Sequence, residues 1–162
     1  MRERKARALW APWRMEYIAG PRVSGCFLCA MLRRGGDREG LVVFRGRRCA
    51  VLMNRYPYNN GHLMVAPRRH VPDLRAMTRA ERAEAMDLVG RGIEALRAAV
   101  HPDGFNVGLN LGKAAGAGLE GHVHFHIVPR WNGDTNFMPV VADVKVIPQA
   151  LAELCAVLRR AF

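Results

Sequence analysis

The sequence lacks the long apolar run that a membrane-spanning helix requires. No stretch of the 162 residues approaches the roughly 18 uninterrupted apolar positions needed to cross a bilayer. Residues 1–14 are basic, but they carry neither the apolar segment nor the small-residue cleavage site of a secretory signal. We therefore expect a cytoplasmic protein with no membrane partner.

Internal repeats, low-complexity tracts and long linkers are also missing. The composition is 50% hydrophobic and 24% charged, which excludes a disordered tail, a collagen-like fibre and a coiled-coil rod. A chain of this length buries a substantial core. We expect one domain over residues 1–162, with its core at about 26–131 and flanking extensions at 1–25 and 132–162.

Acidic residues are few. The chain has 14 Asp and Glu against 25 Lys and Arg, which leaves a formal charge of +11. Such an excess suits a polyanionic partner, whether nucleic acid, anionic lipid or a phosphate-rich small molecule. A compositional bias toward Arg and Ala explains it equally well. No zinc finger or aromatic stacking platform accompanies the charge, which disfavours nucleic acid as the partner.

Cysteine is scarce as well, and a disulfide framework is not expected from four cysteines in a cytosolic chain. Cys49 lies in an apolar run and Cys155 on the apolar face of a C-terminal helix, so we predict that both fill the core. Cys26 and Cys29 form a CxxC pair. That spacing is typical of half a zinc site or of a redox motif.

Apolar runs and alternating patterns predict five strands and two helices. Thr78 and Glu81 form a capping box that opens the first helix, and Pro148 precedes the second. The fold class is therefore α+β, an antiparallel sheet of about five strands with helices packed on one face. The predicted strands are 41–44, 49–54, 62–66, 105–111 and 122–128. In the fourth strand one face carries Phe105, Val107, Leu109 and Leu111. The apolar face of the first helix is Met86, Val89, Ile93, Leu96 and Val100, and that of the second is Leu151, Leu154, Cys155 and Leu158.

Three histidines fall at a spacing of two in the segment GHVHFHIVPR. On a strand, His122, His124 and His126 would share one face at intervals of roughly 6.6–6.8 Å, while the apolar residues between them face the core. Such a ladder suits a metal site or a nucleophilic imidazole with supporting neighbours. The spacing alone does not distinguish these chemistries, and it disfavours a merely solvated strand.

The surroundings of this strand favour phosphorus as the electrophile. The preceding loop 112–121 is rich in Gly and Ala, so its backbone N–H groups can approach an anion, although it has no GKS or GKT motif. Lys113 and Arg130 add positive charge on either side. We expect a phosphate-bearing substrate.

The segment His122-Val123-His124-Phe125-His126-Ile127-Val128 resembles the signature of the histidine-triad (HIT) family. Residues 53–71 and 104–112 are similar to further family segments, and the resemblance covers most of 26–131. It implies a HIT-like fold, a homodimer and a nucleotidyl transferase or hydrolase.

The resemblance also implies roles for individual residues. His124 would attack the α-phosphorus, His126 would bind phosphate or the bridging oxygen, and His62 would support them. Asn54 would contact ribose, and Asn110, on the polar face of its strand, would contact phosphate. Many members carry Gln, Ser or Thr shortly before the first histidine. Here the corresponding residues are Ala117, Gly118 and Leu119, so phosphate contacts there would come from the backbone, as at Gly118.

A metal site follows from the same resemblance. In several bacterial members a CxxC pair, a histidine at the place of His70 and the first triad histidine bind structural zinc. Cys26, Cys29, His70 and His122 supply all four ligands here. Zinc at His122 would leave His124 as the nucleophile. No redox or organic cofactor is expected.

The flanks, residues 9–18 and 129–140, resemble the branch of bacterial diadenosine-tetraphosphate phosphorylases and hydrolases. Arg130, Trp131 and Asn136 would then hold the distal part of the substrate, unless these segments serve edge packing or dimer contacts. The expected activity is cleavage of dinucleoside polyphosphates, with phosphate or water as acceptor. The alternatives are a nucleoside phosphoramidate or adenylate hydrolase, a nucleic-acid-end deadenylating or binding protein, and a non-catalytic module in which all three triad histidines bind metal.

Overall fold

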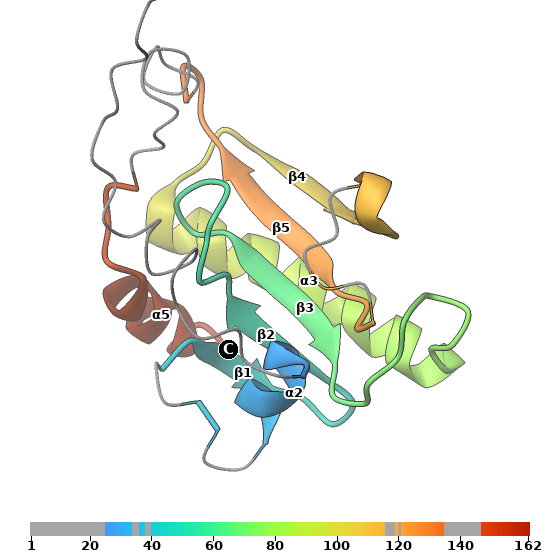
Figure 1. Ribbon diagram of the computed structural model, residues 1–162. Coiled ribbons are helices and arrows are strands. Elements are labelled where there is room, and N and C mark those ends of the chain that lie inside the picture. The colour runs from blue at the N-terminus through green and yellow to red at the C-terminus, as the bar shows by residue number, and fades with distance from the viewer. Residues whose placement is uncertain (1–24, 34–35, 38–39, 116–118, 120, 135–146) are drawn as a thin grey trace, which may run out of the picture.

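Five antiparallel strands form a single sheet in the order β1-β2-β3-β5-β4 (Figure 1). The computed structural model describes residues 25–33, 36–37, 40–115, 119, 121–134 and 147–162. Both the predicted number of strands and their antiparallel arrangement are confirmed. The strands are β1 (Val42–Arg45), β2 (Cys49–Met53), β3 (Leu63–Pro67), β4 (Gly104–Leu109) and β5 (Phe125–Arg130).

The fifth strand begins later than predicted. β5 pairs with β3 from Phe125 to Ile127 and with β4 from Gly104↔Arg130 to Leu109↔Phe125. Only His126 of the three triad histidines therefore belongs to the strand. Pro129 is tolerated inside β5 because β3 pairs no further than Ile127, so the proline has a strand neighbour on one side only.

The fourth strand is shorter than predicted and ends at Leu109. Phe105 and Leu109 pack against the core, as expected. Val107, two residues from each of them on the same strand face, is 45% exposed, and Leu111, which lies beyond the end of the strand, is 47% exposed. The reason is that β4 lies at the edge of the sheet, with a strand neighbour on one side only.

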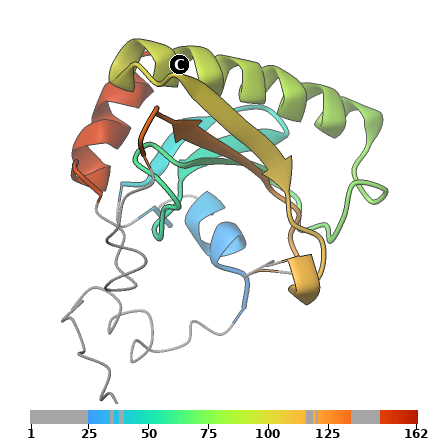
Figure 2. The ribbon, with the colours of Figure 1, turned by 90° about the horizontal axis from the view of Figure 1, so that it is seen from above.

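Two helices cover one face of the sheet (Figure 2): α3 (Arg79–Val100) and α5 (Leu151–Arg159). The capping box at Thr78 and Glu81 is confirmed. The predicted apolar face of α3 is wrong at Met86, whose side chain is 48% exposed and not buried. Small residues of α3 make its closest contact with the sheet. A Cβ at Gly92 would lie 2.8 Å from a side-chain carbon of Ile127. The buried residues of α3 are Glu81, Ala85, Leu88, Val89, Gly92, Ala95 and Leu96.

A third helix, α2 (Phe27–Leu32), lies on the opposite face, so the expectation of helices on one face holds only for α3 and α5 (Figure 2). The core consists of two clusters, one on each face of the sheet. Leu28 and Leu32 of α2 are buried in the second cluster. Cys49 and Cys155 are fully buried in the cluster under α3, as predicted. The cluster under α2 comprises Leu28, Leu32, Val42, Ala50, Leu52, Met64 and Ala66.

None of the described helices is both long and apolar enough to cross a bilayer.

Candidate active site and metal centre

Three buried imidazoles lie together on the sheet face that α2 partly covers. His126 is opposite Met64 in the β3–β5 ladder, and it points away from α3 because its neighbours Phe125 and Ile127 belong to the core under that helix. His62 directly precedes β3, and its Nε2 lies 2.9 Å from Nδ1 of His126. The His124 ring is 4.8 Å from the His126 ring, edge to face. All three side chains are less than one tenth exposed.

Hydrogen-bond partners assign the proton positions on His62 and His126. The backbone N–H of Tyr58 donates to Nδ1 of His62 over 3.0 Å, so a neutral His62 carries its proton on Nε2. That proton is donated to Nδ1 of His126. Neutral His126 therefore carries its own proton on Nε2, where it can donate to a bound oxyanion.

His124 has the complementary arrangement. Its Nδ1 lies 2.8 Å from the carbonyl oxygen of His122, which only accepts, so Nδ1 carries the proton and Nε2 has the lone pair. A nucleophilic nitrogen is thereby placed beside an N–H donor. Burial and the charge of His124 lower the pKa of His126 to about 4, which keeps His126 neutral near pH 7.

Tyr58 is part of this site, although no sequence motif predicted a role for it. Its ring lies 4.6 Å from the His62 ring and 5.6 Å from the His126 ring. The only sequence signal is its position four residues before His62, in the turn that leads into β3. The ring covers both imidazoles from the solvent side, since Tyr58 is 46% exposed while the histidines are buried.

The four predicted metal ligands also meet. The ligand atoms of Cys26, Cys29, His70 and His122 all lie within 4.8 Å of one another. Nδ1 of His122 is 3.1 Å from Cys26 Sγ and 3.5 Å from Cys29 Sγ, and Nδ1 of His70 is 3.3 Å from Cys29 Sγ. A tetrahedral zinc ion would separate sulfur and nitrogen ligands by about 3.5 Å. The donor set and its spacing therefore fit zinc.

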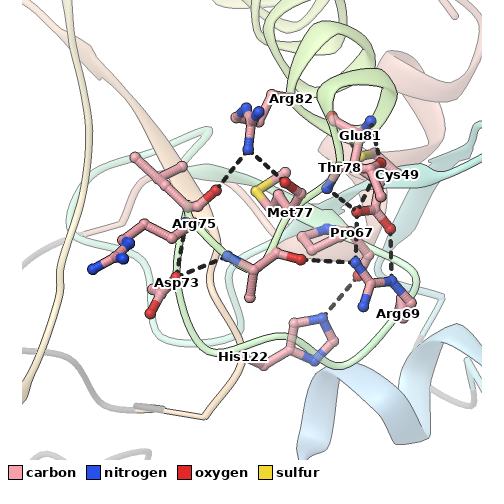
Figure 3. Close-up of polar contacts among 12 residues, drawn as sticks. Cys49, Pro67, Arg69, Asp73, Arg75, Met77, Thr78, Glu81, Arg82 and His122 are labelled. Atoms are coloured by element: carbon pink, nitrogen blue, oxygen red, sulfur yellow. Dashed lines mark hydrogen bonds and ion pairs between the residues drawn. The ribbon is translucent and has the colours of Figure 1, made fainter.

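The orientation of His122 supports this fit. Its Nε2 donates to the carbonyl oxygen of Pro67 over 2.8 Å (Figure 3), so the lone pair of Nδ1 faces the two cysteines. Burial lowers the pKa of His122 and so favours the neutral, metal-binding form. Among the described residues this cluster includes no other triad histidine, which disfavours a module that binds metal through all three.

Residues 36–133 match the family model described as the HIT domain. The chain belongs to the HIT family. A HIT-domain relative, the AP-4-A phosphorylase of Mycobacterium tuberculosis H37Rv, is 44% identical over 153 residues, covering 90% of this chain and 78% of that protein.

Solved HIT structures share the fold. A zinc-bound histidine triad family protein from Mycobacterium smegmatis superposes with a TM-score of 0.67 at 29% identity, covering 85% of this chain and 92% of that one. A hypothetical histidine triad nucleotide-binding protein from Sulfolobus tokodaii gives a TM-score of 0.68 at 25% identity, covering 84% and 91%. The predicted family is confirmed.

Two of the predicted substrate contacts lie beside the HIT histidines. Asn54 approaches Nδ1 of His62 at 3.3 Å through its amide nitrogen. Asn110 directly follows β4, whose last residue pairs with Phe125, so it lies near the level of His124. Lys113 is exposed in the short helix η1 (Lys113–Ala115).

Arg130 and Trp131 are engaged elsewhere in the protein. The Arg130 guanidinium donates to both carboxylate oxygens of Asp134 and to the Asn106 side chain. The Trp131 indole N–H donates to the carbonyl of His101 over 3.2 Å. Arg130 is four strand residues beyond His126, about 13 Å away. Gly118, residues 9–18 and Asn136 lie outside the described residues.

Proposed function

We propose that this chain cleaves dinucleoside polyphosphates at the α-phosphate through a covalent nucleotidyl-His124 intermediate. The observation that carries the proposal is the lone pair on Nε2 of His124 beside the Nε2–H of His126. The 44% identity to an AP-4-A phosphorylase supports the substrate class. A reactive nitrogen and a donor for phosphate oxygens are the two groups that nucleotidyl transfer needs.

The reaction has two steps. Nε2 of His124 attacks the α-phosphorus, a P–N bond forms, and the P–O bond to the remaining nucleoside polyphosphate breaks. The carbonyl of His122 stabilises the positive charge that develops on the ring through Nδ1–H. His126 donates to the phosphate oxygens. An acceptor then attacks phosphorus, the P–N bond breaks, and His124 is regenerated.

We propose diadenosine tetraphosphate as substrate and inorganic phosphate as acceptor. Both follow from the same phosphorylase relative. Asn54 would bind ribose, and Asn110 and Lys113 the phosphate chain, with backbone contacts at Gly118. Arg130 and Trp131 would contribute at the distal end, provided that the substrate displaces their partners. A homodimer and a cytoplasmic location stay predictions.

We also propose a structural zinc ion at Cys26, Cys29, His70 and His122. These residues close a four-ligand site, and zinc bound there would supply a cross-link between α2 and the residues before β5. The His122 carbonyl that orients His124 belongs to one of these ligands. The metal centre would therefore position the nucleophile without taking part in the chemistry.

The test is incubation of the purified protein with diadenosine tetraphosphate, with and without phosphate. ADP and ATP formed only with phosphate identify a phosphorylase, whereas ATP and AMP formed without it identify a hydrolase. His124→Asn should abolish turnover, and His101→Asn, a change at an exposed histidine, should not. Turnover by His124→Asn would refute the mechanism. Turnover of a nucleoside phosphoramidate or an adenylate alone would favour the alternative substrates.

A further inference from the structure

Five arginines line a groove of about 590 Å³ beside the metal centre. They come from three parts of the chain: the end of α2, the turn between β1 and β2, and the residues that follow β3. Among the described residues of the lining, Glu81 is the single acidic one. The arginines are Arg33, Arg47, Arg48, Arg68 and Arg69.

Two of these arginines are held in place by the protein. Arg69 donates to both carboxylate oxygens of Glu81, at 3.0 and 2.9 Å, and to the carbonyl of Ala76 at 2.9 Å (Figure 3). Arg68 donates to the carbonyl of Gly46 over 3.3 Å, which ties the end of β3 to the β1–β2 turn. Side chains fixed in this way lose little freedom when a ligand binds.

The β1–β2 turn is fixed from beneath as well. The carboxylate of Glu84 on α3 accepts from the backbone N–H groups of Arg48 and Cys49, at 2.9 and 3.1 Å. The backbone that carries Arg47 and Arg48 is thereby attached to the long helix. The groove is a preformed feature of the folded chain.

The other three arginines have no counter-ion among the described residues. Within the described part of the chain, the guanidinium groups of Arg33, Arg47 and Arg48 make no hydrogen bond or ion pair. The one carboxylate of the lining is already paired with Arg69. Like charges gathered in this way repel one another, and an anion in the groove would relieve that repulsion.

We propose that this groove is a second anion site, which binds a short phosphate chain such as tripolyphosphate or the polyphosphate moiety of a nucleotide. Guanidinium groups match phosphate oxygens in charge and in hydrogen-bond geometry. No aromatic side chain is among the described residues that line the groove, so none of them offers a ring on which a base could stack. Its volume suits a small ligand rather than an extended duplex. None of His62, His124 and His126 lines it, so the site is separate from the proposed active site.

The experiment is calorimetric titration of the full-length protein with inorganic tripolyphosphate, comparing Arg47→Gln with a matched control. The control, Arg97→Gln, also removes one positive charge. Arg97 lies 16 residues after Glu81 on α3, about 24 Å from it along the helix axis and so away from the groove. Arg47→Gln should weaken binding about tenfold, and Arg97→Gln should leave it within twofold of the wild type. Parallel titrations use ATP, to identify the source of the phosphate chain, and duplex DNA.

Equal affinities for Arg47→Gln and Arg97→Gln would overturn the proposal. The proposal would also be overturned, in favour of a nucleic-acid surface, if duplex DNA bound more tightly than tripolyphosphate and Arg47→Gln abolished the DNA binding. Diadenosine tetraphosphate turnover, measured in parallel, should be unchanged in Arg47→Gln. If neither the wild type nor the variants turn over diadenosine tetraphosphate, but the wild type still binds tripolyphosphate, the proposed activity is refuted. The proposed anion site is then unaffected.

Discussion

At the scale of single residues, three backbone groups decide what the imidazoles can do. The N–H of Tyr58 fixes one nitrogen of His62, and the carbonyl of His122 fixes one nitrogen of His124. The carbonyl of Pro67 does the same for His122. In the proposed function, His62 is a donor relay, His124 the nucleophile and His122 a metal ligand. Residue type alone could not assign these roles, because neutral histidine has two tautomers and only its surroundings select one.

Tyr58 offers a test of how the His62–His126 pair is held. Tyr58→Ala keeps the backbone N–H but removes the ring that lies over both imidazoles. We expect kcat to fall up to tenfold, since such ring contacts contribute about 0.5–1.5 kcal/mol. Tyr58→Phe keeps the ring and should be close to wild type. The measurement is steady-state turnover of diadenosine tetraphosphate, and equal rates for the two variants would contradict this role.

The lowered pKa of His126 makes a prediction about stability. Its folded pKa, about 4, lies below the ordinary value of 6.5, so below pH 6.5 the unfolded chain binds a proton that the folded chain does not. As the pH is lowered from 6.5 to about 4, the free energy of unfolding should therefore fall by about 1.4 kcal/mol per pH unit. In denaturant titrations, His126→Gln should lose this part of the slope and His101→Gln should not. Parallel slopes for His126→Gln and wild type would contradict the assignment.

At the scale of elements, α2 depends on its surroundings for its stability. It has six residues, too few to be stable alone, and Cys26 caps it by accepting from the N–H of Cys29. Leu28 and Leu32 attach it to the sheet. The metal centre would provide its second attachment, to His70 and His122.

Removal of the metal should therefore destabilise the fold. A ligand present at a thousandfold excess over its Kd stabilises by about 4 kcal/mol, which corresponds to a loss of about 10 °C in Tm after chelation. Cys29→Ser should show the same loss and bind no zinc by elemental analysis. Cys155→Ser, at a buried position outside the cluster, should lower Tm but retain the metal. Zinc retained in Cys29→Ser would refute the ligand set.

The elements that could be predicted from sequence are those with local signals. The capping box of α3 and the presence of a strand at β4 require only near neighbours. The start of β5, the exposure of Met86 and the helix α2 were missed because they depend on distant partners. The His122 side chain bonds to the carbonyl of Pro67, 55 residues away, and α2 is too short for a periodic pattern. Likewise, spacing singled out His122, His124 and His126 as candidates, whereas Tyr58 is recognisable only by its ring contacts.

At the scale of the whole molecule, the charge of +11 has two components. Five arginines gather in one groove, and others are used within the fold, as Arg159 is on the carbonyl of Val42 and the carboxylate of Asp37. The excess is thus neither wholly a compositional bias nor evidence for nucleic acid. Its common effect is a positive field around the molecule, which attracts polyanionic substrates.

That field predicts a specific dependence on salt. Raising the ionic strength from about 0.02 M to about 0.2 M shortens the Debye length about threefold, from roughly 22 to 7 Å. The kcat/KM for diadenosine tetraphosphate should fall several-fold because the capture of a multiply charged anion is slowed. The kcat should stay constant, because the buried histidines at the site are screened far less. Adenosine phosphoramidate, which carries less charge, should show a weaker dependence in the same assay. A kcat/KM that is independent of salt for both substrates would show that the charge does not act on substrate capture.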